Sequence, residues 1–373
     1  MMKVALVHEL LTMKGGAERV LKIFANMFPE APIYTLLYNK EKLGDWFAAD
    51  RVIPAKLPIP YSLFPDPYRY NHHLYLRAFP KAVEAWDFFD YDLVISSSSA
   101  FAHGIITNGK PKHLCYVQSP ARYLWDRTHD VLDRAGKGML GPLKRRHLER
   151  TFHQLRIWDS EAAARPDMLL AASKEVQRRI ELYWRRESDV IYPPIDDFWL
   201  QPVTSNQQPV TSTYYLVVST LVHYKRIELA IEACNKGKRP LKIIGEGPAR
   251  KELEKCAGPT VEFLGFQPQE KIRELYTNAT ATLFPGDEDF GLVPLESMAC
   301  GTPVIAYRSG GALETIVEGE TGEFFTEPTA ESLLQAMEKC EQKTYTKNVL
   351  TARSTLFSRT HFEEGIRSAI ALL

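Results

Sequence analysis

The chain has 373 residues, about twice the length of a typical single domain. Its 45% hydrophobic and 25% charged residues are globular averages, which exclude disordered and fibrous proteins. A formal net charge of zero argues against nucleic-acid binding, which depends mainly on phosphate neutralisation.

Membrane and cysteine patterns point to a cytoplasmic protein. Mean hydropathy is −0.24, and no apolar run approaches the roughly 20 residues of a membrane-spanning helix. Residues 1–11 read as a short strand and lack the charged-then-apolar layout of a signal peptide. The five cysteines are odd in number, widely spaced and never form C-x-x-C. This argues against a disulfide framework and a zinc site.

Apolar, β-rich runs alternate with helical patterns throughout the chain, which is typical of parallel sheets built from βαβ units. Predicted strands cover residues 3–8, 33–37, 93–97, 112–117, 168–172, 214–219, 241–244, 261–264, 281–284 and 302–306. Predicted helices cover residues 17–27, 174–184, 226–234, 248–255, 268–278, 295–300 and 330–341.

The pattern breaks at residues 201–213, which are mostly Gln, Ser, Thr and Pro and offer no apolar anchor. We expect an N-terminal α/β domain over residues 1–200, this linker, and a C-terminal α/β domain over residues 214–357. An amphipathic helix over residues 358–373 can pack on either domain. A ligand belongs in a cleft at the carboxyl ends of both sheets.

The most informative stretch runs over residues 283–301, LFPGDEDFGLVPLESMACG. A strand ends at Phe284, a polar loop follows, and a helix is predicted to start near Pro294 with the amides of residues 290–292 at its N-terminus, where anions bind. Glu288 lies in the loop and Glu296 in the expected first turn. Carboxylates accept hydrogen bonds from sugar hydroxyls, but each also has a simpler explanation, as a dipole-capping or solvated charge.

As a whole, this string resembles the donor-sugar motif of retaining glycosyltransferases of family 4, which have the GT-B fold. The resemblance spans nearly the whole chain and is strongest to bacterial mannosyltransferases of O-antigen and exopolysaccharide synthesis. Its other motifs are GGAERV (15–20), DLVISSSSAFAHG (92–104), CYVQSPARYLWD (115–126), LVHYKRIELAIEA (221–233), IIGEGP (243–248), VEFLGF (261–266) and GGALETIVEGETG (310–322).

The resemblance implies a role for individual residues. Glu296 would bind the ribose, Glu288 the donor sugar, and Lys225 the leaving diphosphate, whose charge also needs the helix-end amides. Gly15 and Gly16 would let the first loop approach both substrates closely. The donor-binding residues implied are Gly15, Gly16, Thr220, Lys225, Arg226, Gly245, Gly247, Phe266, Glu288, Asp289, Phe290, Gly291, Leu292 and Glu296.

Two positions depart from the family pattern. Thr220 stands where the family usually has an arginine, so Arg226 is the candidate for a second diphosphate cation. Gln118 stands where the family often has a histidine near the donor sugar, which leaves that role to Gln118 or to His103. His103 can equally be an ordinary loop histidine.

Metal binding is not expected. Residues 287–289 and 90–92 both match D-x-D, but any acidic triplet does so. The second triplet precedes a strand and is typical of a turn, while Lys225 can supply the positive charge near the first. We expect no cofactor besides the nucleotide-sugar donor, which is a substrate.

The IIGEGP segment lacks the third glycine of a dinucleotide fingerprint and indicates a tight turn lining the nucleotide cleft. Phe266, after the next strand, is a candidate neighbour of the base, although aromatic residues in this position are more often part of the core.

Three segments are candidates for acceptor or membrane contact. Residues 54–86 are rich in Pro, Tyr and Phe and form either an aromatic acceptor platform or a self-packed loop. Arg122, Tyr123 and Trp125 follow Gln118 and are expected to contact the acceptor. Residues 139–158 combine basic and apolar positions at helical spacing, which suits an anionic inner leaflet or a solvated face over a local core.

We expect a retaining hexosyltransferase that moves α-mannose from GDP-mannose to a lipid-linked oligosaccharide acceptor, at the cytoplasmic face of the membrane. A UDP-sugar donor is an alternative. Two alternatives belong to other classes: a GT-B nucleotide-sugar epimerase and a catalytically degenerate binding subunit. The second is considered because Thr220 and Gln118 depart from the family pattern.

Overall fold

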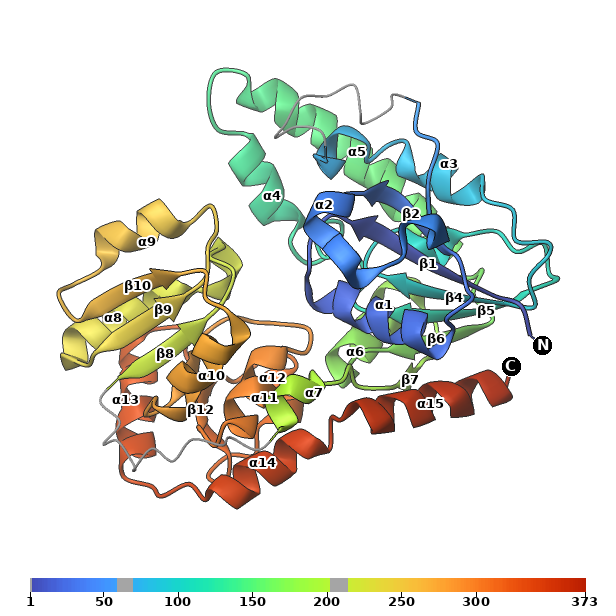
Figure 1. Cartoon of the computed structure of the whole chain (residues 1–373). Helices are drawn as coiled ribbons and strands as arrows, with labels where there is room; N and C mark the ends of the chain where they lie inside the picture. Colours follow the sequence, from blue (N-terminus) through green and yellow to red (C-terminus); the bar gives the residue numbers. More distant parts are fainter. Residues whose placement is uncertain (1, 59–69, 202–213) are drawn as a thin grey trace. The chain divides into compact units, whose positions relative to one another are not determined.

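The computed structural model describes residues 2–58, 70–201 and 214–373 (Figure 1). The predicted linker therefore lies, apart from Gln201, outside the described residues. Contacts divide the chain into two compact units: unit 1 holds residues 1–192 and 365–373, and unit 2 holds residues 193–364.

Unit 1 is built on a seven-stranded sheet in the order β3-β2-β1-β4-β5-β6-β7, with every pair parallel. Its strands are β1 (Val4–Leu11), β2 (Ile33–Tyr38), β3 (Val52–Pro54), β4 (Leu93–Ser98), β5 (Lys112–Val117), β6 (Met168–Ala171) and β7 (Asp189–Val190). The central strands are buried along almost their whole length, as is typical of a parallel sheet covered on both faces.

The helices of unit 1 follow the strands in the βαβ manner. They are α1 (Gly16–Met27), α2 (Lys40–Leu43), α3 (Phe79–Glu84), α4 (Thr128–Ala135), α5 (Gly141–Ala162) and α6 (Lys174–Trp184), with short 3-10 turns at Gly44–Trp46, Ala49–Arg51, His72–Leu74 and Ala102–Gly104. Local sequence explains their limits. The Ser173 side chain accepts a hydrogen bond from the Val176 amide at 3.0 Å, a cap that fixes the start of α6.

Unit 2 repeats this plan with a six-stranded parallel sheet in the order β10-β9-β8-β11-β12-β13. Its strands are β8 (Tyr215–Val218), β9 (Leu241–Ile244), β10 (Val261–Gly265), β11 (Thr282–Phe284), β12 (Val304–Tyr307) and β13 (Gly322–Phe325). The described chain thus has the predicted α/β class, with two Rossmann-like units.

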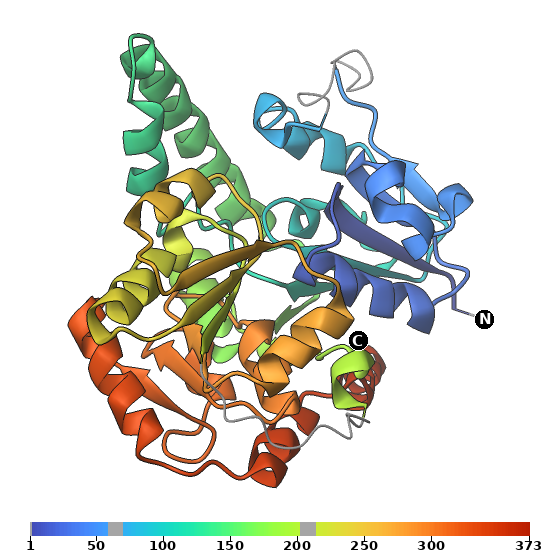
Figure 2. The same ribbon diagram turned by 60° about the vertical axis from the view of Figure 1, so that its left-hand side comes forward.

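Helices cover both faces of the second sheet (Figure 2). They are α7 (Asp197–Leu200), α8 (Ile227–Gly237), α9 (Arg250–Cys256), α10 (Gln269–Thr277), α11 (Leu292–Ala299), α12 (Ala312–Thr315), α13 (Ala330–Glu341) and α14 (Lys347–Thr355), with a 3-10 turn at His223–Lys225. Helices α8 and α13 share one face, where Ile231, Leu333 and Met337 join the buried core. The predicted C-terminal helix forms as α15 (Arg359–Ala371), whose residues from Gly365 onward group with unit 1.

The strand orders fix where a ligand can bind in each unit. In unit 1 the chain moves outward from β1 in one direction and from β4 in the other. In unit 2 the same reversal lies between β8 and β11. Such switch points leave a crevice at the carboxyl ends of the two strands.

Candidate functional site

In unit 2, the loops after β8 and β11 meet at the switch point. The first loop carries Lys225 in its 3-10 turn, and the second carries Glu288 before α11. The two side chains form an ion pair between Lys225 Nζ and Glu288 Oε1, and they are 16% and 19% exposed. Two residues predicted independently for the diphosphate and the sugar are therefore in direct contact.

The backbone of the two loops also packs tightly. A Cβ atom added at Gly286 would lie 3.0 Å from Lys225 Cα, so any larger residue would press the loop after β11 against the turn that holds the lysine. This approach places the ammonium group over the loop that carries Glu288.

The two neighbours of Lys225 that bear on diphosphate binding are Thr220 and Arg226. Thr220 is exposed directly after β8, so the missing arginine leaves an open position. Arg226 has a left-handed backbone with φ of 51°, which ends the 3-10 turn and makes α8 begin one residue later than predicted. Its guanidinium lies 5.0 Å from the Tyr307 ring centre, and its buried Nη1 atom has no hydrogen-bond partner in the described part of the chain.

The glycine pair after β12 shapes the sugar loop from the other side, a contribution that the sequence analysis did not assign. The Gly311 amide donates to the Glu288 carbonyl at 2.9 Å, and Ser309 Oγ donates to Asp287 Oδ1 at 3.0 Å. A Cβ atom at Gly310 would lie 2.2 Å from the Glu288 carbonyl oxygen. The signal in the sequence was the Gly-Gly pair directly after a strand.

Helix α11 begins earlier than predicted. It starts at Leu292, after Gly291 with φ of 83°, so the amides of Gly291 and Leu292 lie at an N-terminus where no helical carbonyl precedes them. Because of this earlier start, Glu296 lies in the second turn, and the expectation of a first-turn carboxylate was wrong. Glu296 is buried, and its Oε2 atom accepts a hydrogen bond from Tyr276 Oη at 3.3 Å.

The loops after β9 and β10 complete the carboxyl edge of the second sheet. A Cβ atom at Gly245 or Gly247 would lie 1.9 Å from the Ser219 carbonyl oxygen or 2.3 Å from that of Leu221, so both glycines are required for packing against the loop after β8. Phe266 follows β10 and is 82% exposed, which contradicts the alternative that it belongs to the core.

In unit 1, the predicted glycines lie at the carboxyl end of β1. Gly15 is the N-cap of α1, which starts at Gly16, and the Gly15 amide donates to Glu18 Oε2 at 3.0 Å. The other carboxylate oxygen, Glu18 Oε1, lies 3.9 Å from His8 Nε2. Burial would lower the pKa of His8, but the hydrogen bond and charge of Glu18 outweigh burial and raise it.

Glu9 is a buried carboxylate that sequence reasoning missed. Its Oε1 atom accepts four consecutive backbone amides, from residues 99–102, at 2.7 to 3.1 Å, and the Ser98 hydroxyl at 2.9 Å. Burial would raise the pKa of Glu9, but the charge of His8 and these amides lower it. Glu9 therefore fixes the loop after β4 as an internal anion.

Gln118 extends this arrangement from β5. The backbone amide of Gln118 donates to the Ser98 carbonyl at 2.8 Å. In the side chain, Nε2 donates to Ser97 Oγ at 3.2 Å. The side chain is partly exposed, so the neutral hydrogen-bonding group sits at the carboxyl edge of the first sheet.

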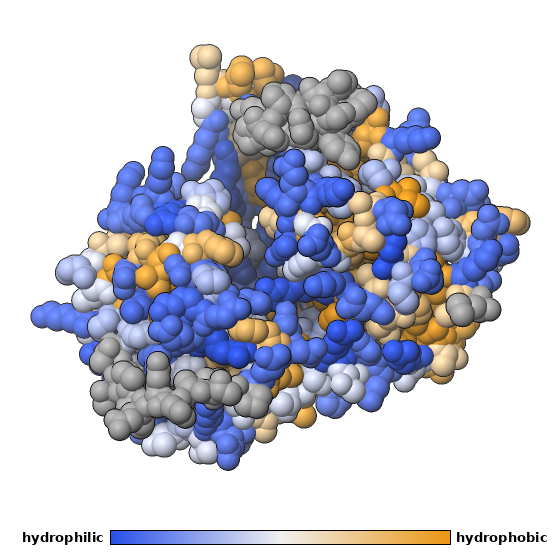
Figure 3. Space-filling view, viewed as in Figure 1, coloured by the Kyte–Doolittle hydropathy of each residue, from blue (hydrophilic) through white to orange (hydrophobic). Residues whose placement is uncertain are grey.

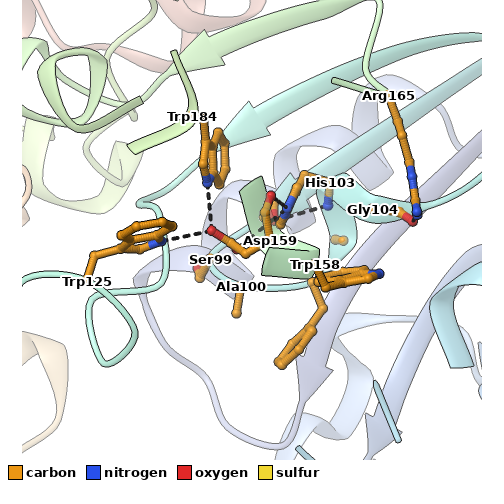
Figure 4. A network of polar contacts seen from close by, with 12 residues as sticks. Ser99, Ala100, His103, Gly104, Trp125, Trp158, Asp159, Arg165 and Trp184 are labelled. Carbon is orange, nitrogen blue, oxygen red and sulfur yellow. Dashed lines mark hydrogen bonds and ion pairs between the residues drawn. The ribbon is translucent and has the colours of Figure 1, made fainter. Parts of the chain in front are cut away.

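His103, the other candidate for this role, is fully buried. Its Nδ1 atom lies 3.2 Å from Ser98 Oγ, and its Nε2 atom lies 3.6 Å from Asp159 Oδ1. Figure 4 shows that Trp125 and Trp184 point their indole N–H groups at the same carboxylate, at 2.9 and 2.7 Å. Burial lowers the pKa of His103 and raises that of Asp159, which fits a structural core network rather than a substrate contact.

The predicted acceptor residues also make internal contacts. Arg122 pairs with Asp126 at 3.1 Å, and the buried Tyr123 hydroxyl has no hydrogen-bond partner among the described residues. Burial raises the pKa of Tyr123 well above its usual value. Trp125 stacks on Tyr183 at 4.9 Å besides its bond to Asp159. Arg122, Tyr123 and Trp125 are all partly exposed, but the Tyr123 hydroxyl is buried.

Helices α4 and α5 form a hairpin that projects from unit 1 (Figures 1 and 2). At its tip, Met139, Leu140 and Leu143 are 96%, 56% and 68% exposed, and apolar atoms gather there in the space-filling view (Figure 3). Farther along α5, Phe152 and Leu155 are buried in the core of unit 1. The predicted amphipathic stretch is thus divided, with a core-packed half and an exposed tip.

Of the aromatic segment over residues 54–86, residues 59–69 lie outside the described part, including Tyr61, Phe64 and Tyr68. Tyr75 is buried and stacks on Phe79 at 6.1 Å, which favours the self-packed alternative for that residue. Asp92 accepts the Lys3 amide at 2.7 Å, as expected for a strand entry.

Neither a metal site nor a membrane-spanning helix is found among the described residues. No group of three or more His, Cys, Asp and Glu side chains there is arranged to hold a metal ion. No helix in that part combines the length and the apolar composition needed to cross a membrane.

Sequence comparison identifies relatives of part of the chain. Residues 203–354 match the family model described as "Glycosyl transferases group 1". An uncharacterized glycosyltransferase of Methanocaldococcus jannaschii is 25% identical over 43% of this chain and 46% of its own length. A GDP-mannose-dependent alpha-(1-6)-phosphatidylinositol dimannoside mannosyltransferase of Mycobacterium tuberculosis is 42% identical over 22% of each chain. The chain thus spans less than half the length of these curated relatives.

Solved structures match the chain over its full length. Anabaena HepE in complex with UDP has a TM-score of 0.71 at 17% identity, with 99% of this chain and all of that chain covered. Sucrose-phosphate synthase from Thermosynechococcus elongatus has a TM-score of 0.72 at 16% identity, with both chains fully covered. The chain therefore shares the GT-B fold with these structures, and over residues 203–354 it is similar in sequence to the glycosyl transferases group 1 family.

Proposed function

We propose that the protein is a retaining glycosyltransferase that takes a nucleotide sugar as donor and a lipid-linked oligosaccharide as acceptor. The observation that carries the proposal is the contact between Lys225 and Glu288 beside the N-terminus of α11, at the switch point of the second sheet. A cation, a carboxylate and free helix-end amides in one crevice are the groups that a sugar diphosphate requires.

The ion pair suggests how the donor is accepted. A diphosphate entering the crevice competes with Glu288 for the Lys225 ammonium group, and the amides of Gly291 and Leu292 hold its oxygens. The displaced carboxylate then accepts hydrogen bonds from the hydroxyls of the donor sugar. Lys225 stabilises the charge that develops on the diphosphate when the bond to the sugar breaks.

Glu296 is the proposed ribose ligand. It is buried in the second turn of α11, and Tyr276 orients its carboxylate through the hydrogen bond to Oε2. Phe266, exposed at the end of β10, offers a ring on which the base can stack.

Retention follows from attack on the same face of the sugar that the diphosphate leaves. In this mechanism the new bond joins the acceptor oxygen to the sugar carbon, the bond to the diphosphate breaks, and a leaving phosphate oxygen takes the acceptor proton. No covalent nucleophile is assigned, and no metal is required because Lys225 and the helix-end amides supply the positive charge.

We propose GDP-mannose as the donor. The support is the sequence similarity to a relative whose name states GDP-mannose dependence and the similarity to alpha-1,3/1,6-mannosyltransferase ALG2 of Mus musculus, 41% identical over 24% of this chain. A UDP-sugar is the alternative donor, because the structurally similar Anabaena HepE binds UDP.

The acceptor is proposed to be a lipid-linked oligosaccharide, reached at the cytoplasmic face of a membrane. The exposed apolar tip of the α4–α5 hairpin, with basic residues beside it, is suited to the surface of an anionic leaflet.

Thermal stability with GDP, UDP, ADP and TDP, and then with the sugars of the base that stabilises most, tests the donor. A ligand at about 100 times its dissociation constant adds about 2.7 kcal/mol, a shift of several degrees at roughly 2–4 °C per kcal/mol. We expect the largest shift with GDP and GDP-mannose. Stabilisation by UDP alone would show that the donor is a UDP-sugar and not GDP-mannose. The absence of stabilisation by every nucleotide would contradict the proposed activity.

Two variants locate the binding. Lys225→Gln should lose most of the nucleotide shift, whereas Lys251→Gln, at an exposed lysine on α9, should keep it. Glu288→Gln should keep the nucleotide shift and lose transfer to membrane-extracted acceptors, and the exposed Glu320→Gln serves as its control. Conversion of the donor without an acceptor would favour an epimerase instead.

A further inference from the structure

A second pocket lies in unit 1, apart from the donor crevice. It encloses about 510 Å³ and is lined by Arg77, Leu143, Arg146, His147, Arg150 and Gln154. All but Arg77 come from α5, at spacings of three or four residues, so they share one face of the helix. Arg77 comes from the segment between the His72–Leu74 turn and α3. The pocket is far larger than the ~30 Å³ share of one water molecule.

The lining carries three arginines and no acidic residue. None of the three guanidinium groups makes a hydrogen bond or an ion pair in the described part of the chain, and all three residues are exposed. Arg145, by contrast, is held by Asp133 at 2.8 Å and Glu149 at 2.9 Å. Arg146 and Arg150 are four residues apart, a like-charge spacing that destabilises a helix. The fold thus keeps three positive charges together without a counter-ion from the described residues.

Guanidinium groups bind phosphate oxygens in a planar, two-pronged geometry, and several of them around one pocket select a doubly charged phosphate group. We propose that Arg77, Arg146 and Arg150 bind the phosphate or diphosphate group that joins the acceptor sugar to its lipid. The assignment to the acceptor rests on the proposed function, whereas the anion site itself does not.

Leu143 links this pocket to the membrane-facing surface. It lines the pocket and is also one of the exposed apolar residues of the hairpin tip. A lipid phosphate lies at the boundary between water and the apolar chains of a bilayer. An arginine pocket that is continuous with an exposed apolar tip matches that boundary.

Calorimetric titration with inorganic diphosphate tests the anion site. All proteins carry Lys225→Gln, so that binding in the donor crevice does not contribute. We expect Arg146→Gln with Arg150→Gln to weaken binding by about tenfold or more, because both charge-assisted contacts are lost. The same loss in Arg77→Gln would place the third arginine at the site.

The matched control removes two charges from the same hairpin outside the pocket, with Lys137→Gln and Lys144→Gln. Both lysines are exposed, so this variant should bind diphosphate as the parent does. Equal weakening in both double variants would overturn the proposal in favour of a diffuse positive field. Unchanged binding in the arginine variant would also overturn it. Unaltered thermal unfolding of each variant verifies that the fold is intact.

Vesicles distinguish the source of the phosphate. Neutral phosphatidylcholine vesicles are compared with the same vesicles containing a polyprenyl diphosphate or phosphatidylglycerol. Recruitment by the polyprenyl diphosphate that requires Arg146 and Arg150, and that inorganic diphosphate competes away, supports the acceptor assignment. Equal recruitment by phosphatidylglycerol would make the pocket a general headgroup site and overturn that assignment. Nucleotide shifts are measured separately, so a failed donor proposal leaves this result readable.

Discussion

At the scale of single residues, Glu9 shows how a buried charge can organise a loop. One carboxylate oxygen faces four successive amides and a hydroxyl, which replaces the water that the charge lost on burial. The loop that Glu9 holds extends to His103, whose backbone amide donates to Ser98 Oγ. The Ser98 carbonyl also accepts a hydrogen bond from the backbone amide of Gln118. The position of Gln118 at the sheet edge thus depends on a carboxylate that cannot itself reach a substrate.

Glu9→Gln should lower the free energy of unfolding by about 1–3 kcal/mol near neutral pH, because the amides lose a charged acceptor. The pKa of Glu9 is below its ordinary value of 4.5. Its stabilisation is therefore present above that value and is lost as the pH falls through the folded-state pKa. Urea unfolding at about pH 7 and about pH 4 should show a difference that shrinks on acidification.

The exposed Glu161→Gln is the matched control in the same unit and should change stability little at either pH. A Glu9→Gln variant as stable as the parent at neutral pH would show that the amides do not need the charge.

At the scale of elements, the glycine pair after β12 determines the shape of the sugar loop. Gly310→Ala would bring a Cβ atom within 2.2 Å of the Glu288 carbonyl oxygen, at a φ of 58°. The loop must then move away, and Glu288 with it. We expect transfer to fall by about tenfold or more, since a misplacement of about 1 Å can cost up to about 10²-fold. Initial rates at saturating acceptor measure this.

Gly109→Ala separates the effect of crowding from that of backbone strain. Gly109 also has a positive φ, of 74°, but nothing lies within 4 Å of its added Cβ atom. The substitution should cost about 1–2 kcal/mol of stability and leave the transfer rate unchanged. Equal losses of activity in both variants would mean that the contact with Glu288 is not the cause.

Sequence predicted most of the buried strands well, because β12 is a continuous apolar run and β4 begins with the apolar residues Leu93–Ile95. It missed β3, β7 and β13. Strands β3 and β7 have three and two residues and are too short for a periodic signal, and β13 is the four residues GEFF, which begin with glycine and include a glutamate. In the candidate site, the sequence identified Lys225 and Glu288, which are 63 residues apart. It could not show that they pair, because the contact between their loops depends on Gly286 and Gly310. The start of α11 was predicted from Pro294, whereas Gly291 determines it.

At the scale of the whole molecule, we expect the exposed apolar tip of the α4–α5 hairpin to bind the protein to membranes. Met139→Ser with Leu140→Ser removes two exposed apolar side chains, each worth about 1.5–3 kcal/mol when fully buried. Binding to phosphatidylglycerol-containing vesicles should fall by about tenfold or more, as measured by co-sedimentation. Leu313→Ser with Leu356→Ser, at residues 50% and 56% exposed in unit 2, should bind as the parent does. Equal binding by the tip variant would contradict a role of the hairpin in recruitment.

The positive charge available in the donor crevice determines whether transfer depends on a metal ion. A leaving nucleoside diphosphate needs positive charge, from either a divalent cation or the protein. Here Lys225 is already at the crevice, Arg226 follows it, and the amides of Gly291 and Leu292 add the positive end of α11. Asp287, an acidic residue of the same loop, accepts a hydrogen bond from Ser309. Transfer by the parent should therefore continue undiminished in excess EDTA. Loss of parent activity in EDTA that Mg²⁺ or Mn²⁺ restores would assign the charge to a metal, and Lys225 would then serve mainly to hold Glu288.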